Sequence, residues 1–225
     1  MRAASLSNDP YGVLWTSDTL VLRQCSVSSM DNNVYLVTCR HTGEQLLVDA
    51  ADDLERIDRL IEHGTADHDT VSTSSIVTTH RHWDHHRALS GVQDQTGART
   101  LAGSDDADHL PVPVDVRLAH GDVVAIGDVE IAVLALRGHT PGSVALAIPG
   151  GDPDGTTLLV TGDSLFPGGP GKTESAADFT SLVDDLEGRV FGVYADSTIV
   201  LPGHGDGTTL GTERPQLRDW RQRGW

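Results

Sequence analysis

The segment from His80 to His85 holds four potential metal ligands within six residues: His80, His82, Asp84 and His85. Imidazole and carboxylate groups are ligands that zinc and iron accept in proteins. In an extended segment His80 and His82 point the same way, because side chains alternate with a period of two. A turn must then direct Asp84 and His85 toward a second position. The pattern favours two neighbouring ions over one, and its alternative is a histidine-rich surface turn without a metal.

Three later side chains of the same types stand alone in the sequence. His139, Asp163 and His204 each follow a short apolar run, and each lies beside a glycine. Taken singly, such residues are often plain turn residues. Glycine lets the backbone approach closely, which suits both a tight turn and a ligand site. Their recurrence at the ends of apolar runs favours one shared site.

The elements that must position these side chains are mainly short strands. Alternating or β-branched runs predict strands at 19–24, 34–38, 45–48, 75–78, 123–126, 130–136, 144–148, 157–161 and 198–201. Apolar stripes predict helices at 87–95 and 178–186, and a third helix that Asp52 or Asp53 caps and Gly64 ends. This order suits two packed sheets with helices outside. Loops at strand ends would bring the polar motifs to one edge of the sheets.

Four motifs together resemble the metallo-β-lactamase superfamily, and within it the glyoxalase II-like (hydroxyacylglutathione hydrolase-like) branch. They are His-x-His-x-Asp-His at 80–85, Gly-His-Thr-Pro-Gly at 138–142, Thr-Gly-Asp at 161–163 and Pro-Gly-His-Gly at 202–205. The resemblance runs from about Met30 to Arg214. It implies an α/β fold, a four-layer αββα sandwich with the site at one edge. The length fits one domain of this fold over residues 1–225.

The resemblance also implies a role for each motif residue. His80, His82 and His139 would bind a first divalent metal ion; Asp84, His85 and His204 would bind a second; Asp163 would bridge the two. We expect zinc, with iron or manganese as alternatives. Asp84 and Asp163 would be the catalytic carboxylates, and Asp49 would orient the His-rich loop. Phe166 and Lys172, the only lysine, lie on a loop that contacts substrate in such enzymes.

The expected reaction is hydrolysis of a small-thiol thioester by a hydroxide that bridges two metals. Cations about 3.5–4 Å apart lower the pKa of a shared water toward neutrality. One alternative is a mononuclear iron persulfide dioxygenase, and another is a hydrolase of other esters, lactones or phosphodiesters. A metal-storing or regulatory binding module is a third interpretation. Glyoxalase II enzymes that bind glutathione typically add a helical domain, and only about ten residues follow Arg214 here, so a thiol other than glutathione is expected.

Composition limits the partners. The formal net charge of −17 disfavours nucleic acid and anionic membrane surfaces, so we expect a small-molecule substrate. Met1 to Gly12 has no apolar run typical of a signal peptide, and no stretch reaches the ~18 apolar residues of a membrane span. These features predict a cytoplasmic protein, and the sequence leaves its oligomeric state open.

Overall fold

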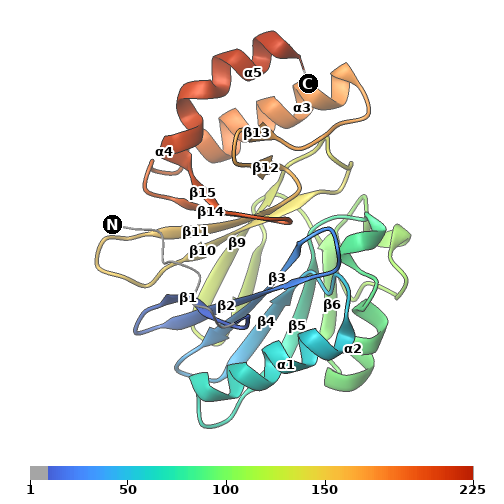
Figure 1. Cartoon of the computed structure of the whole chain (residues 1–225), viewed down its shortest axis with the longest axis vertical. Helices are drawn as coiled ribbons and strands as arrows, with labels where there is room; N and C mark the ends of the chain where they lie inside the picture. Colours follow the sequence, from blue (N-terminus) through green and yellow to red (C-terminus); the bar gives the residue numbers. More distant parts are fainter. Residues whose placement is uncertain (1–9, 225) are drawn as a thin grey trace.

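The computed structural model describes residues 10–224, so most of the stretch interpreted as lacking a signal peptide lies outside it. Two sheets pack face to face, α1 and α2 cover the outer face of one, and α3 and α5 cover the outer face of the other (Figure 1). The predicted four-layer αββα sandwich is confirmed.

Within the described residues, the first sheet has seven strands in chain order. They are β1 (Val13–Thr16), β2 (Leu20–Val27), β3 (Asn32–Cys39), β4 (Glu44–Val48), β5 (Ser72–Thr78), β6 (Arg99–Gly103) and β7 (Val116–Leu118). Strands β1 to β4 pair antiparallel, whereas β4 to β7 pair parallel. The parallel strands place their carboxyl ends at one edge of the sheet.

In the same part of the chain, the second sheet has six strands. Their order is β15 (Thr208–Thr209), β14 (Ile199–Pro202), β11 (Thr157–Gly162), β10 (Val144–Pro149), β9 (Val129–Ala135) and β8 (Val123–Ile126). A separate pair, β12 (Leu165–Phe166) and β13 (Gly169–Pro170), follows β11. Strands β11 and β14 are parallel, so their carboxyl ends also share an edge.

Five α-helices complete the described fold: α1 (Leu54–Gly64), α2 (Leu89–Thr96), α3 (Ala176–Asp185), α4 (Leu210–Glu213) and α5 (Leu217–Arg223). Asp53 caps α1, since its side chain accepts the backbone N–H of Arg56. The prediction that Gly64 ends this helix is confirmed. Gly64 has a right-handed conformation (φ −62°) and passes the chain directly into a 3₁₀ turn.

The outer helices stay in place by burying apolar stripes. Ile57 and Leu60 of α1 pack on the outer face of the first sheet. Leu182 of α3 and Trp220 of α5 pack on the outer face of the second. Full burial of such side chains contributes about 1.5–3 kcal/mol each.

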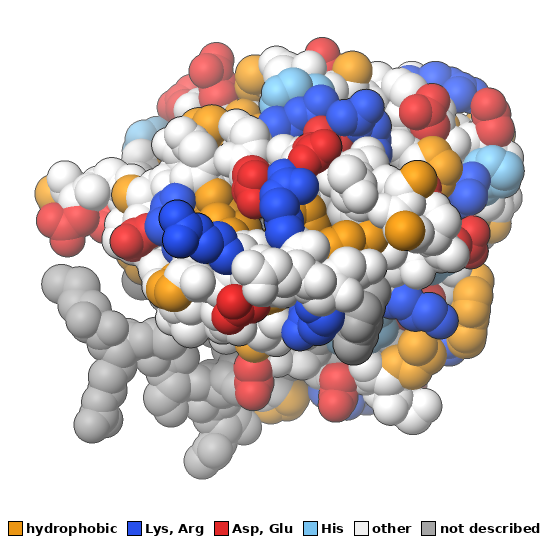
Figure 2. All heavy atoms as spheres, turned by 90° about the horizontal axis from the view of Figure 1, so that it is seen from above, with side chains coloured by type: hydrophobic (Ala, Val, Ile, Leu, Met, Phe, Trp, Pro, Cys, Tyr) orange, Lys and Arg blue, Asp and Glu red, His pale blue; other side chains and the backbone are white. Residues whose placement is uncertain are grey.

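On the outer surface over α3 and α5, basic and acidic side chains lie interspersed (Figure 2). Arg221 contacts Glu187 at 2.8 Å and also contacts Asp184. Exposed pairs of this kind contribute little to stability, typically about 0–1 kcal/mol. Their effect here is to neutralise basic side chains locally, so this face offers no continuous positive surface.

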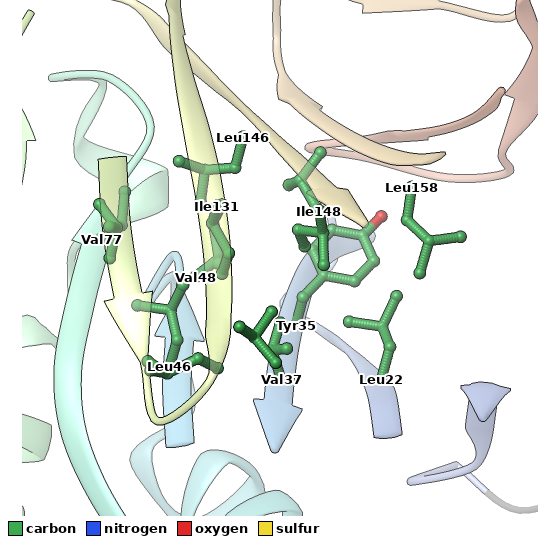
Figure 3. Packing of buried hydrophobic residues seen from close by; sticks show 14 of the residues in the cluster. Leu22, Tyr35, Val37, Leu46, Val48, Val77, Ile131, Leu146, Ile148 and Leu158 are labelled. Atoms are coloured by element: carbon green, nitrogen blue, oxygen red, sulfur yellow. The ribbon is translucent and has the colours of Figure 1, made fainter. Parts of the chain in front are cut away.

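The main core lies between the two sheets (Figure 3). Leu22, Val37 and Val48 from the first sheet face Ile131 and Ile148 from the second. These positions alternate with outward-facing ones along each strand, as the period of two requires. The packing fixes one sheet against the other, and it thereby fixes the two sets of strand ends that carry the polar motifs.

Among the described residues, no helix is both long and apolar enough to cross a membrane.

Candidate metal centre

The predicted ligands lie where strands of both sheets end. The His80–His85 segment follows β5, while His139, Asp163 and His204 follow β9, β11 and β14. Backbone hydrogen bonds join the two sheets at this edge: the N–H of Asn33 donates to Gly203 O at 2.8 Å, and that of Val144 to Thr79 O at 2.9 Å. The seven ligand candidates are thus drawn together from distant parts of the chain.

His80, His82 and His139 form the first group. His80 Nε2 lies 3.1 Å from His82 Nδ1 and 3.2 Å from His139 Nε2. His80 is buried, and the other two are partly buried. The three nitrogen atoms face a common point, with the first two histidines supplied by one sheet and the third by the other.

Asp84, His85 and His204 form the second group. His85 Nε2 lies 3.1 Å from His204 Nε2 and 3.6 Å from Asp84 Oδ2. Asp163 lies between the groups: its Oδ2 is 3.6 Å from His139 Nε2 and 3.5 Å from His204 Nε2. Its carboxylate therefore faces both groups, as a bridging ligand must.

These separations suit bound cations. Two nitrogen ligands at 2.0–2.1 Å from a tetrahedral zinc ion would lie roughly 3.3 Å apart. The spacings of 3.1–3.6 Å within the two groups match that value. Asp163 Oδ1 is buried and accepts no hydrogen bond in the described residues. A buried carboxylate oxygen without a donor is costly, and a cation would satisfy it. The donor set fits two divalent metal ions.

Hydrogen bonds fix the orientation of several ligand histidines through the ring nitrogen that does not face the centre. His139 Nδ1 contacts Lys172 O at 2.7 Å, and His204 Nδ1 contacts Met30 O at 2.8 Å. Because a carbonyl oxygen only accepts, each Nδ1 carries a proton, which leaves each Nε2 as the atom that would bind a cation. Such contacts orient ligands and set the tautomer.

Asp49 performs this function for His85. Its Oδ2 lies 2.9 Å from His85 Nδ1, and its two oxygens accept the backbone N–H and the hydroxyl of Thr79 at 2.7 and 2.8 Å. Asp49 is buried directly after β4 and has a left-handed backbone (φ 60°), a conformation uncommon outside glycine. It thus joins the end of β5 to a ligand ring.

The ligand side chains of the centre differ in how readily they carry a proton. Burial lowers the pKa of His80 well below its ordinary value, so this ring is neutral. Burial also opposes charge on His85, but the carboxylates of Asp49 and Asp163 outweigh it and raise the pKa of His85 to about 10. Burial opposes ionisation of Asp163, yet the rings of His204 and His85, with Nε2 atoms 3.5 and 3.4 Å from its oxygens, hold its pKa far below the usual range. A metal ion must therefore displace a proton from His85.

The glycine at position 203 is required by close approach. A Cβ atom there would overlap Asp163 Oδ1 and lie 2.7 Å from His85 Cε1. The Pro-Gly-His-Gly motif therefore lets β14 deliver His204 beside the bridging carboxylate.

Two predicted substrate contacts lie at the rim. The ring of Phe166 is 6.5 Å from that of His204. Lys172 is exposed, and its carbonyl rather than its side chain contacts His139. Trp83, within the His-rich segment, is 58% exposed with the guanidinium of Arg87 over its ring at 3.4 Å, so it packs against a neighbour at the rim and not in the core.

Two residues of the centre were missed by the sequence reasoning. Asn32, fully buried, donates to Asp84 O and Oδ2 at 3.1 and 3.0 Å. Asp106, also fully buried, accepts hydrogen bonds from the segments on both sides of the first group. Neither residue stands in a ligand motif. The Met30–Asn33 stretch lay within the extent of the resemblance, which was the one available signal for Asn32.

Comparison with known sequences gives consistent relatives. A hydroxyacylglutathione hydrolase from Cereibacter sphaeroides is 36% identical over 175 residues, covering 77% of this chain and 62% of the relative. The chain thus spans less than two thirds of that relative's length. No protein-family model matches the chain.

Solved structures share the fold. ETHE1 from Myxococcus xanthus has a TM-score of 0.71 at 28% identity, covering 86% of this chain and 81% of that one. The BLEG-1 B3 metallo-β-lactamase has a TM-score of 0.75 at 22% identity, with 88% and 99% covered. TTHA1623, solved in a di-iron-bound form, has a TM-score of 0.67 at 27% identity, with 85% and 96% covered.

The layered sheets, the ligand motifs at their shared edge and these relatives agree. The chain belongs to the metallo-β-lactamase-fold superfamily, in its glyoxalase II-like branch.

Proposed function

We propose that the chain is a metal-dependent hydrolase that cleaves thioesters of small thiols at a centre of two divalent metal ions. The observation that carries this proposal is the convergence of seven ligand side chains into three overlapping groups, one of which joins Asp163 to His80 and His85. Asp163 also lies within 3.6 Å of His139 and His204. The relative from Cereibacter sphaeroides is named as a hydrolase of hydroxyacylglutathione, which is a thioester. Its name supports this substrate class.

In this proposal each ion has its own ligands. His80, His82 and His139 would hold the first, Asp84, His85 and His204 would hold the second, and Asp163 would be shared between them. We propose zinc for both positions. Iron and manganese accept the same ligands, and a structural neighbour was solved with two irons.

When bound, two adjacent cations lower the pKa of a shared water and polarise a carbonyl oxygen. The chain supplies the carboxylates that make this possible. The nearby rings of His85 and His204 keep Asp163 ionised, and Asn32 orients the Oδ2 atom of Asp84. We assign Asp84 and Asp163 as the catalytic carboxylates. A thiolate needs little help to leave, because a thiol has a pKa of only about 8.5.

Substrate contacts would come from the loop after β11. Phe166 lies beside His204 and would provide an apolar wall for the acyl group. Lys172 follows β13 with an exposed side chain, and its carbonyl places it next to His139. A carboxylate on the thiol would be a fitting partner for this ammonium group.

Cytoplasmic location and a single domain over 1–225 stay predictions.

The test is a panel of thioesters with the metal-loaded protein. Lactoyl and formyl thioesters of glutathione and of other thiols should be hydrolysed to a carboxylic acid and a free thiol. The chelated protein and Asp163→Asn should be inactive. Lack of turnover of every panel member by protein that holds two metal ions would refute thioester hydrolysis.

A mononuclear iron persulfide dioxygenase is the second candidate. His139 Nε2 lies 3.2 Å from His80 Nε2 and 3.6 Å from Asp163 Oδ2. Two histidines with one carboxylate are a ligand set that non-haem iron uses. The additional group of Asp84, His85 and His204, which one iron would not need, favours the hydrolase. One iron per chain with oxygen uptake on a persulfide would reverse this preference.

A further inference from the structure

Asp106 lies directly behind the first ligand group. It follows β6 in a turn, its side chain is fully buried, and the proposed reaction gives it no role. Its Oδ2 accepts the backbone N–H of Arg81 at 3.0 Å, and its Oδ1 lies 3.7 Å from Arg81 Nε. Arg81 stands between His80 and His82. One buried carboxylate therefore holds the backbone between two ligands of the same ion.

The same carboxylate also holds the loop of His139. Oδ1 accepts the backbone N–H of Gly142 at 3.0 Å, and Oδ2 accepts the hydroxyl of Thr140. Thr140 follows His139 directly, and its N–H donates to Ser143 Oγ at 3.1 Å. The turn that presents His139 is thus closed on itself and tied to Asp106.

These contacts matter because the first group is divided between the sheets. His80 and His82 follow β5 in one sheet, and His139 follows β9 in the other. Charge-assisted hydrogen bonds to a buried carboxylate are roughly twice as strong as neutral ones. Their loss would let the two ligand-bearing segments shift relative to each other.

The second group has separate support. Asn32 donates to Asp84 and forms an isolated bridge with His204. Asp49 holds His85. None of these three contacts involves Asp106, so the second group keeps its own support when Asp106 is removed. Asp49 also reaches the first group, since the Thr79 hydroxyl that donates to it lies 3.1 Å from His80 Nδ1.

We propose that Asp106 is a positioning residue that sets the spacing between the His80–His82 segment and His139, and thereby the affinity for the first metal ion. This inference rests on the proposed two-ion centre. It predicts a selective defect: removal of Asp106 weakens the first ion and spares the second.

The test compares Asp106→Asn and Asp106→Ala with Asp67→Asn. Asp67 is a matched control, because it is a buried carboxylate that accepts from Arg23 Nε and Nη2 at 2.9 and 2.7 Å and from a threonine hydroxyl, and it is not a contact of the ligand segments. Each metal-free protein is titrated with Zn²⁺ against a chelator, and with Co²⁺ to follow its visible spectrum. Circular dichroism checks folding; if Asp106→Ala fails to fold, Asp106→Asn, which preserves volume, carries the test.

The wild type should bind two Zn²⁺ in two resolvable steps. In the Asp106 variants one step should weaken by about 10–100-fold, the range typical of contacts that orient ligands, with loss of the matching Co²⁺ bands. Asp67→Asn should keep both steps. Unchanged Zn²⁺ affinities in the Asp106 variants, or an equal loss of affinity in Asp67→Asn, would overturn this inference. Neither result would contradict the proposed hydrolase function. A wild type that binds no metal would instead refute the proposed function.

Discussion

At the scale of single residues, the centre depends on competition between protons and cations. His85 has a pKa raised to about 10 in the metal-free protein, because Asp49 and Asp163 outweigh the effect of burial. The ring is therefore protonated at neutral pH and must lose its proton to present Nε2 to an ion. The two carboxylates that stabilise the protonated ring therefore make a proton compete with the cation for His85 Nε2.

Metal binding should consequently release protons. At pH 7.5 we expect His85 to release about one proton when the ion of the second group binds. His204, whose pKa is raised by Asp163, should release further protons. The affinity for Zn²⁺ should fall as pH is lowered, by about tenfold per pH unit for each proton released. Calorimetry of Zn²⁺ binding in buffers of different ionisation enthalpy measures the release. Heats that do not depend on the buffer would contradict it.

Lys172 allows a second test at this scale. Its carbonyl holds His139 whereas its ammonium group is exposed, so Lys172→Ala should remove a substrate contact and leave the metal centre intact. For a thioester that carries a carboxylate we expect KM to rise by about 10-fold with little change in kcat, as uniform binding is lost. Lys172→Arg, which keeps the charge, is the matched control. An unchanged KM in Lys172→Ala would rule out this contact.

The seven ligand candidates could be predicted because histidine and aspartate in motifs after apolar runs carry a strong chemical signal. Asp106 gives no such signal. It stands in an acidic turn, Ser104-Asp105-Asp106, and only the packing of β6 against the loop after β9 shows that its partners come from two other segments. Contacts that orient ligands depend on tertiary geometry, which spacing in a sequence does not reveal.

At the scale of elements, strands with a clear apolar run were predicted well, and the described strands of only two or three residues were missed. Strands β3, β9, β10 and β11 agree with predicted ranges to within a few residues. Strand β7 has only three residues, too few for a pattern of alternation. Helix α5 was not predicted either, because one apolar side chain, Trp220, supplies most of its burial between charged residues.

The C-terminal elements contact the loop that carries the proposed substrate residues. Glu213, at the end of α4, is buried; it accepts the N–H of Gly168 at 2.9 Å and the hydroxyl of Thr208 at 2.7 Å. Glu213→Ala would leave both donors without this partner, at about 1–3 kcal/mol of the free energy of unfolding. Urea denaturation measures the loss. Glu62→Ala, at an exposed position of α1, should change stability by less than about 0.5 kcal/mol. Equal stability of the two variants would show that Glu213 does not hold this loop.

At the scale of the whole molecule, the two sheets and the centre between their ends form one connected structure. The core between the sheets is continuous, and ligands from both sheets meet at one edge. We therefore expect one cooperative unfolding transition for the chain, shifted upward by bound metal. A free metal concentration 100-fold above Kd adds about 2.7 kcal/mol per ion to the free energy of unfolding. Calorimetry before and after chelation tests this, and two separate transitions would contradict the prediction of one domain.

At the edge where the sheets meet, seven side chains from four loops are expected to hold a pair of cations. Elemental analysis of the purified, dialysed protein tests this most directly. We predict two equivalents of a divalent transition metal per chain, and loss of metal from Asp163→Asn. A metal content near zero after exposure to excess Zn²⁺ would contradict a two-ion centre. If the wild type holds one equivalent and Asp163→Asn retains it, Asp163 is not a ligand shared by two ions.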